Sequence, residues 1–264
     1  MTQPAFPACI ELSLTRAHPS WHGHLRSGLQ AMALAQPDYF SELARCEFLP
    51  TAHRMFAAFA VPLNSIHYVL MGEGPYPRAE SATGVCFMDG AVHSLWQDGV
   101  GLSKEVNRAT SLRNFVKMLL VADGVLNINH TGAVAMQSVS RMACAADSNW
   151  IRTGSELQSN LMGNGFLLLN ASLVFRPEVA PASDARAWLP FLRIILQALS
   201  CQPEISQLIL WGRIAEKIAV LPEVRRCKTL VSEHPYNLSF IGNEDMQHFF
   251  RPFQLLKKSR SSSQ

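Results

Sequence analysis

Four short apolar runs that do not alternate with polar residues most strongly constrain the fold of this 264-residue chain. Such runs are typical of strands buried on both faces of a parallel sheet. Segments with helical periodicity follow the runs along the chain. Strand, crossover helix and strand in repetition predict an α/β fold with a doubly wound parallel sheet. The strands are expected at 66–71, 166–169, 208–211 and 229–231, and the helices at 111–122, 187–200, 212–221 and 243–257.

The remaining segments define the expected domain organisation. Residues 1–24 contain three prolines and little periodicity, which predicts an irregular N-terminal arm. Residues 25–257 are expected to form a single domain, with two helices between positions 24 and 60. The stretch at about 123–160 is too long for an ordinary connection and is interpreted as an insertion with some helix of its own. Residues 258–264 are predicted to be a flexible tail.

Composition excludes several classes of protein. Hydrophobic residues make up 48% of the chain and charged residues 16%, so a large buried core is available. The net charge of +3 means that any contact with nucleic acid must come from local grouping of charges. The six cysteines form no CxxC pair, which argues against a zinc or iron–sulfur site. No run reaches the length needed to span a bilayer, and we expect a cytoplasmic protein with reduced thiols, no metal and no membrane contact.

The residues that follow the four apolar runs are chemically distinctive. Glu73 and Tyr76 lie in a turn after the first run, and Asn170 ends the second. Trp211 ends the third run, and His234 follows the fourth. Each of these alone is typical of an ordinary turn or cap. Because ligands of open α/β sheets bind at the carboxyl ends of the strands, the set predicts one site in which carboxylate, phenol, amide and imidazole converge.

The same segments resemble the motifs of the uracil-DNA glycosylase superfamily, most closely its family-one enzymes. GEGPYP at 72–77 is similar to their GQDPYH, and LLLN at 167–170 to their LLLN strand. ILWG at 209–212 resembles their LLWG, and HPYNLS at 234–239 their HPSPLS. The 13 positions from Gly74 to Phe87 and the 64 from Asn170 to His234 also match the family. The resemblance implies a three-layer α/β/α glycosylase-like domain with a central four-stranded parallel sheet.

The resemblance also implies roles for individual residues. Asn170 would read the Watson–Crick edge of a flipped pyrimidine, and Phe87 would stack on that base. His234 would hydrogen-bond O2 of the base as negative charge develops on the departing ring. Leu238 would fill the emptied position in the base stack. Further contacts to DNA are expected from Ser111, Ser239, Pro75, Pro235 and Tyr236, and Gly74 and Tyr76 would complete the base pocket.

The sequence departs from the family at the residue that activates water. The family's Asp aligns with Gly74, and Glu73 replaces the preceding Gln. Gly-Glu-x-Pro resembles the turn of the superfamily's iron–sulfur branch, which also lacks that Asp, although the cysteine spacing excludes its cluster. Three interpretations stay open. Glu73, or another carboxylate such as Asp89, substitutes for the Asp; the pocket is enlarged for a different base; or the chemistry is lost and binding is kept.

The second interpretation gives the most specific hypothesis about function. In family-one enzymes the tyrosine of the first motif excludes groups on C5 of the pyrimidine. Tyr76 is retained, but Pro77 replaces the His that follows it, so the ring could take another path. We therefore expect a 5-substituted cytosine of phage DNA, hydroxymethylated or glucosylated, as the target in anti-phage defence. The alternatives are a uracil-DNA glycosylase of base excision repair and a silenced DNA-binding homologue.

The expected enzyme is a monofunctional DNA glycosylase, a hydrolase that leaves an abasic site. Glu73, Asn170 and His234 are its predicted catalytic residues. None of the strand-end motifs contains a lysine that could form a Schiff base, so lyase activity is not expected. The predicted partner is DNA, with no cofactor and no obligate protein partner, and the protein is expected to be a monomer.

Overall fold

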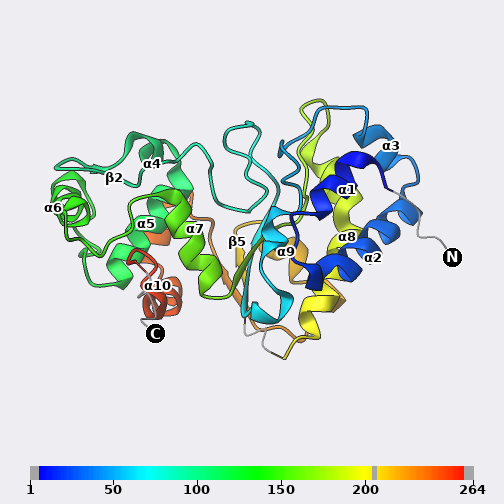
Figure 1. Ribbon diagram of the computed structural model, residues 1–264. Helices are drawn as coiled ribbons and strands as arrows, with labels where there is room; N and C mark the ends of the chain where they lie inside the picture. Colours follow the sequence, from blue (N-terminus) through cyan, green and yellow to red (C-terminus); the bar gives the residue numbers. More distant parts are fainter. Residues whose placement is uncertain (1–5, 204–206, 259–264) are drawn as a thin grey trace, which may run out of the picture. The chain divides into compact units, whose positions relative to one another are not determined.

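The computed structural model describes residues 6–203 and 207–258 (Figure 1). The chain divides into two compact units. Unit 1 comprises Met1–Phe87 and Gly165–Val231, and unit 2 comprises Met88–Asn164 and Ser232–Gln264. Positions 1–5 of the expected N-terminal arm and positions 259–264 of the expected tail lie outside the described residues. The domain boundaries drawn from the sequence stay a prediction.

Unit 1 is built on a four-stranded sheet in the order β4-β1-β5-β6. β1 (Tyr68–Gly72) pairs in parallel with β4 (Phe166–Asn170) on one side and with β5 (Gln207–Trp211) on the other. β6 (Thr229–Ser232) lies beside β5. β4 is buried at all five positions and β1 at its three central ones. The predicted α/β class and the four strands are confirmed.

The edge strand differs from expectation in its burial. The fourth apolar run is predicted to be buried on both faces, but β6 alternates exposed and half-buried residues. Val231 is 51% exposed. The prediction was wrong for this strand because the face that carries Thr229 and Val231 is left to solvent, whereas β4, at the other edge of the sheet, is buried at every position.

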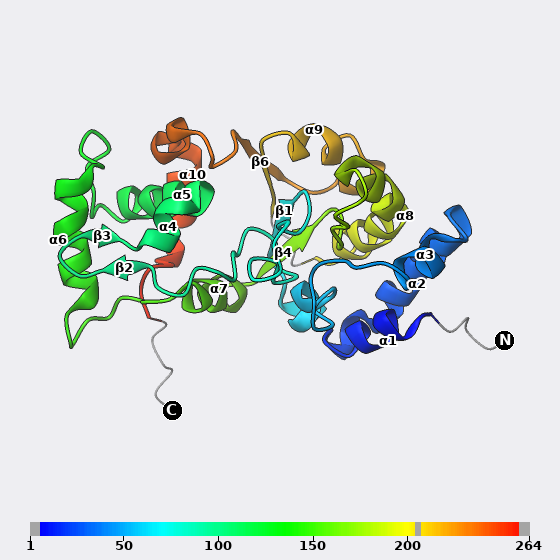
Figure 2. The ribbon, with the colours of Figure 1, turned by 90° about the horizontal axis from the view of Figure 1, so that it is seen from above.

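Helices gather beside the sheet of unit 1, as Figures 1 and 2 show. α2 (His22–Ala35) packs along α8 (Pro181–Ser200). At their contact a Cβ on Gly28 would lie 2.7 Å from the Phe191 ring, so glycine allows the close approach. Leu25, Leu29 and Met32 face the same core as the strand residues. The shorter elements are α3 (Tyr39–Leu43), α9 (Ile214–Ile218) and the 3₁₀ turns Pro19–Trp21, Ala57–Ala60, Leu63–Ser65 and Pro222–Val224.

The segment expected to be an irregular arm contains a helix. α1 (Ala8–Leu14) begins after Pro7, and its Ile10 and Leu14 are buried. These two positions are four residues apart and therefore lie on one helix face. The expectation of irregular structure over 1–24 was wrong here, because a seven-residue helix is too short to show a clear period among three prolines.

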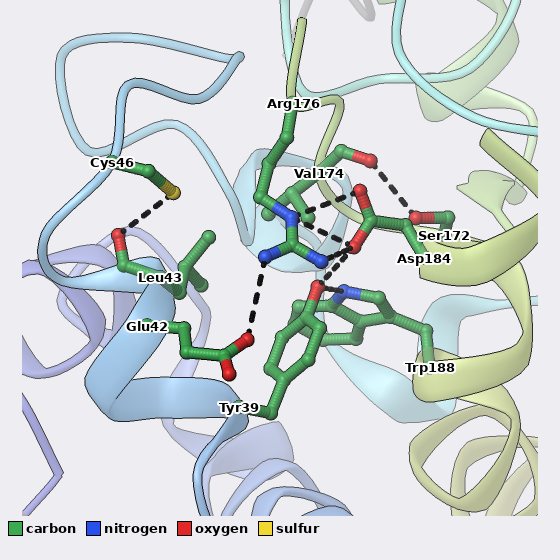
Figure 3. Close-up of polar contacts among 9 residues, drawn as sticks. All are labelled: Tyr39, Glu42, Leu43, Cys46, Ser172, Val174, Arg176, Asp184 and Trp188. Carbon is green, nitrogen blue, oxygen red and sulfur yellow. Dashed lines mark hydrogen bonds and ion pairs between the residues drawn. The ribbon is translucent and has the colours of Figure 1, made fainter. Parts of the chain in front are cut away.

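A buried polar network fixes the segment that follows β4 (Figure 3). Arg176 donates two hydrogen bonds to Oδ1 of Asp184, at 2.7 and 3.0 Å, and Asp184 is 1% exposed. The Tyr39 hydroxyl donates to the same carboxylate at 2.7 Å and accepts from the Trp188 indole at 2.8 Å. Burial, followed by Asp184, raises the pKa of Tyr39. Arg176 thereby anchors the chain six residues after Asn170 to the start of α8.

Unit 2 combines five helices of the described chain with a two-stranded ribbon. α5 (Thr110–Ala122) packs against α10 (Glu244–Phe250) and the 3₁₀ turn Leu238–Gly242. The insertion predicted at about 123–160 contains α6 (Ala133–Cys144), which lies beside the ribbon in Figure 2. The other elements are β2 (Trp96–Gln97), β3 (Gly101–Leu102), α4 (Lys104–Arg108), α7 (Gly154–Gly163) and the turn Arg251–Phe253. None of the helices in the described ranges has the length and apolar character required to traverse a bilayer.

Candidate functional site

Asn170 is a buried amide at the carboxyl end of β4. It lies in register with Gly72, the last residue of β1, and is 4% exposed. A Cβ on Gly72 would lie 2.5 Å from Oδ1 of Asn170 and 2.8 Å from Cβ of Cys86, so only glycine leaves room for the amide. Within residues 6–203 and 207–258 the Asn170 side chain makes no hydrogen bond. The amide is therefore available to bond a ligand or a water molecule.

Two aromatic residues stand at the same end of the sheet. The Tyr76 hydroxyl donates a hydrogen bond of 3.2 Å to the carbonyl oxygen of Phe87. The Phe87 ring packs edge-on against Trp211, the last residue of β5, with ring centroids 5.2 Å apart. Phe87 has a φ of +66°, in the left-handed region that non-glycine residues rarely adopt. Surrounding contacts must hold such a conformation, which typically costs about 1–3 kcal/mol.

The turn after β1 has an ordered backbone and an exposed carboxylate. The carbonyl oxygens of Gly72 and Glu73 accept hydrogen bonds from the amides of Ala171 and Ser172, at 2.8 and 3.1 Å. The Glu73 side chain is exposed, Pro75 is half-buried, and a Cβ on Gly74 would meet nothing closer than Ser172 at 3.8 Å. Space for a side chain therefore exists at position 74. Across the described parts of the chain, no three His, Cys, Asp or Glu residues are placed to hold a metal ion.

His234 lies in unit 2, in the loop that follows β6. Its Nδ1 accepts a hydrogen bond of 3.1 Å from the backbone amide of Tyr236, so a neutral ring must carry its proton on Nε2. His234 can therefore act as a hydrogen-bond donor through Nε2. Tyr236 is 66% exposed and Leu238 is 70% exposed, whereas Pro235 is buried. Leu34 and Val134 are even more exposed, so the exposure of Tyr236 and Leu238 does not by itself mark a binding surface, and their contacts to DNA stay a prediction.

The loop rests on α5 through a residue that the sequence did not single out. Asn114 is fully buried, and its amide nitrogen lies 2.8 Å from the carbonyl oxygen of Pro235, 3.2 Å from that of Tyr236 and 3.3 Å from that of Asn237. Ser111 lies three residues earlier, on the same face of the helix and in its first turn. The partial positive charge of that helix end favours an anion such as a phosphate.

Comparisons with known proteins agree with these features. The curated uracil-DNA glycosylase of Bacteroides thetaiotaomicron is 27% identical over 251 residues, covering 90% of this chain and 93% of that protein. The crystal structure of wild-type UNG, a uracil-DNA glycosylase, from Nitratifractor salsuginis is 34% identical, with a TM-score of 0.84 and coverage of 95% of this chain and 96% of that one. The chain belongs to the uracil-DNA glycosylase family. No protein-family model matches it.

A more distant structure supports the fold alone. The mimivirus uracil-DNA glycosylase is 19% identical, with a TM-score of 0.54 over 87% of this chain and 73% of that one. Together with the Nitratifractor structure it confirms the predicted three-layer α/β/α fold with a central four-stranded sheet. The expectation of a DNA glycosylase, a hydrolase of N-glycosyl bonds, is confirmed by membership of the uracil-DNA glycosylase family.

The predicted site residues fall into two sets within this uracil-DNA glycosylase fold. Unit 1 places Asn170 and the first-motif turn at the carboxyl ends of β1 and β4, and Phe87 against the end of β5. Unit 2 places Ser111 on the helix that supports the 234–239 loop, where Leu238 and Ser239 are exposed. The convergence of His234 with the other three groups, and the role of each residue, stay predictions.

Proposed function

We propose that this protein is a monofunctional pyrimidine-DNA glycosylase that removes uracil and leaves an abasic site. The observation that carries the proposal is the Asn170 amide, which is buried beside Gly72 and makes no hydrogen bond within the described chain. An amide both donates and accepts, as the Watson–Crick edge of uracil requires. The relatives' name supports uracil as the base. The hydrogen bond between Tyr76 and Phe87 also supports uracil, because it keeps the phenol that is expected to exclude groups on C5 beside the predicted stacking residue.

In the proposed reaction, the C1′–N1 bond breaks with both electrons passing to the base. The oxygen of a water molecule forms the new bond to C1′, and its proton goes to a base or to solvent. Negative charge develops on O2 of the base, where the Nε2 proton of His234 donates a hydrogen bond. Glu73 is the proposed carboxylate near C1′, since its side chain is exposed beyond the end of β1.

A second candidate substrate is a 5-substituted cytosine of phage DNA, excised in anti-phage defence. The open space at Gly74 favours it, because the nearest atom to an added Cβ is 3.8 Å away. A missing side chain in the first motif would leave room for a larger base. Both candidates describe a monomeric enzyme in the cytoplasm, acting on DNA without a cofactor.

Mass spectrometry of released bases separates these candidates. The protein is incubated with uracil-containing DNA, unmodified DNA, and phage DNA containing hydroxymethyl- or glucosyl-cytosine. Release of uracil alone supports the first proposal, and release of a modified cytosine supports the second. No released base from any DNA, with DNA still bound, would overturn both and identify a silenced homologue. Asn170→Ala should abolish release, whereas Asn64→Ala, at an exposed position of the same unit, should not.

A further inference from the structure

The peptide unit between Pro235 and Tyr236 is held at both ends. Its carbonyl oxygen accepts a hydrogen bond of 2.8 Å from the Asn114 amide, and its N–H donates one of 3.1 Å to Nδ1 of His234. Asn114 is therefore connected to the imidazole through a single peptide plane. A hydrogen bond to the oxygen of a peptide also polarises its N–H, so the two bonds strengthen each other.

We infer that Asn114 is the positioning residue that fixes the ring orientation and the tautomer of His234. The Asn114 amide donates hydrogen bonds to three consecutive carbonyl oxygens of the loop. These bonds fix the plane of the Pro235–Tyr236 peptide. That plane aims the Tyr236 N–H at Nδ1 and keeps the proton of the neutral ring on Nε2. The inference rests on the proposed role of His234 as a donor to the departing base.

The surroundings of Asn114 keep its amide oriented. The side chain is fully buried within α5, and its Oδ1 accepts a hydrogen bond of 3.3 Å from Nε of Arg113. With the oxygen satisfied in this way, the nitrogen faces the loop. The three carbonyl oxygens around the Asn114 NH₂ group need a hydrogen-bond donor. A carboxylate at this position would repel them. Loss of the NH₂ would leave these oxygens without their shared donor, and the peptide would be able to turn.

Two variants test the inference, and a third provides the control. Asn114→Asp keeps the shape of the side chain but replaces the donor by a carboxylate, and Asn114→Ala removes both groups. Asn160 is the matched control, because it is also a buried asparagine of unit 2 whose Nδ2 donates to two carbonyl oxygens, those of Leu255 and Lys257. Asn160→Ala should destabilise the fold comparably without contacting the 234–239 loop.

The first measurement is the ring-nitrogen NMR spectrum of His234, assigned by comparison with His234→Gln. We expect the wild type and Asn160→Ala to show a single neutral tautomer with the proton on Nε2. Asn114→Asp and Asn114→Ala should lose this single tautomer. If either folded Asn114 variant keeps the wild-type His234 spectrum, the inference is overturned. This measurement needs no substrate, so it stands even if the proposed function fails.

The second measurement is steady-state excision from uracil-containing DNA. We expect the Asn114 variants to lose at least about tenfold in kcat, less than the roughly 10²–10³-fold loss from deleting a direct donor. KM is expected to rise as well, because the loop that Asn114 holds also carries the predicted DNA contacts, so kcat at saturating DNA is the value that tests His234. A kcat equal to that of the wild type would overturn the inference. Absence of activity in the wild type would instead overturn the proposed function and leave the NMR result to decide about Asn114.

Discussion

The hydroxyl of Tyr76 is bonded to the backbone of Phe87, the residue whose ring is predicted to stack on the target base. The hydrogen bond measures 3.2 Å and ends on the carbonyl oxygen of a residue with a φ of +66°. On its other side the Phe87 ring meets Trp211. The backbone carbonyl of Phe87 is thus held by a phenol from the turn after β1, and its ring packs against an indole at the end of β5.

Tyr76→Phe is expected to weaken base excision while keeping the ring in place. The variant loses one neutral hydrogen bond, worth about 1 kcal/mol, which corresponds to about a fivefold loss in kcat/KM. Tyr68→Phe, at the amino end of β1 in the same unit, is the matched control and should keep wild-type activity. Equal activities of the two variants would show that the bond to Phe87 does not support the pocket.

Gly72→Ala is expected to abolish most excision, whereas Gly74→Ala should fold normally. An added Cβ at position 72 would meet Oδ1 of Asn170 at 2.5 Å, but one at position 74 would meet nothing within 3.8 Å. Displacement of a positioned group by about 1 Å can cost about 10² in rate. The measurement is excision from uracil-containing DNA, together with thermal unfolding of both variants. Wild-type activity of Gly72→Ala would contradict the proposed role of Asn170.

Gly74→Asp tests the proposed role of Glu73, because an added carboxylate should raise uracil excision little if Glu73 already lies near C1′. Position 74 has room for a side chain, and the motif resemblance implies that it corresponds to the water-activating Asp of family-one enzymes. A general base contributes about 10²–10⁴-fold, so a gain of about 10² in kcat indicates that the wild type lacks an equivalent carboxylate. Gly74→Asn controls for size. If Gly74→Asp gains nothing and Glu73→Gln loses activity, Glu73 already performs this role.

Asp123→Asn is expected to change how stability depends on pH. Burial raises the pKa of Asp123 from 3.8 to about 6, against the opposing effect of Lys257 and Arg251. Between about pH 4 and 6 the folded state keeps a proton that the unfolded state has lost, so this group makes stability fall as pH rises through that range. The neutral variant Asp123→Asn should not show this loss of stability with rising pH.

Thermal unfolding at several pH values tests this expectation. Asp123→Asn should raise the melting temperature relative to the wild type, by more at pH 7.5 than at pH 4.5. Asp147→Asn, at an exposed position of the same unit, should show no such trend. A constant difference between Asp123→Asn and the wild type across this range would contradict the raised pKa.

The strands and their end residues were predictable because they depend on local patterns. Continuous apolar runs located the four strands to within two residues, and the residues after them were examined because parallel strands end at one edge. Asn114 was missed because its partners lie 121 to 123 positions away. The available signal was a polar residue four positions before buried Met118, on the apolar side of α5.

Gly72 has a consequence for mixtures of intact and altered protein. It lies in β1 of unit 1, whereas the exposed loop with Tyr236 and Leu238 lies in unit 2. A methyl group at position 72 would therefore disable reading of the base without altering the residues of that loop. If Tyr236 and Leu238 contact DNA as predicted, such a variant would occupy target sites and shield them from the intact enzyme. A substitution of this kind would behave as dominant-negative in a cell that expresses both forms.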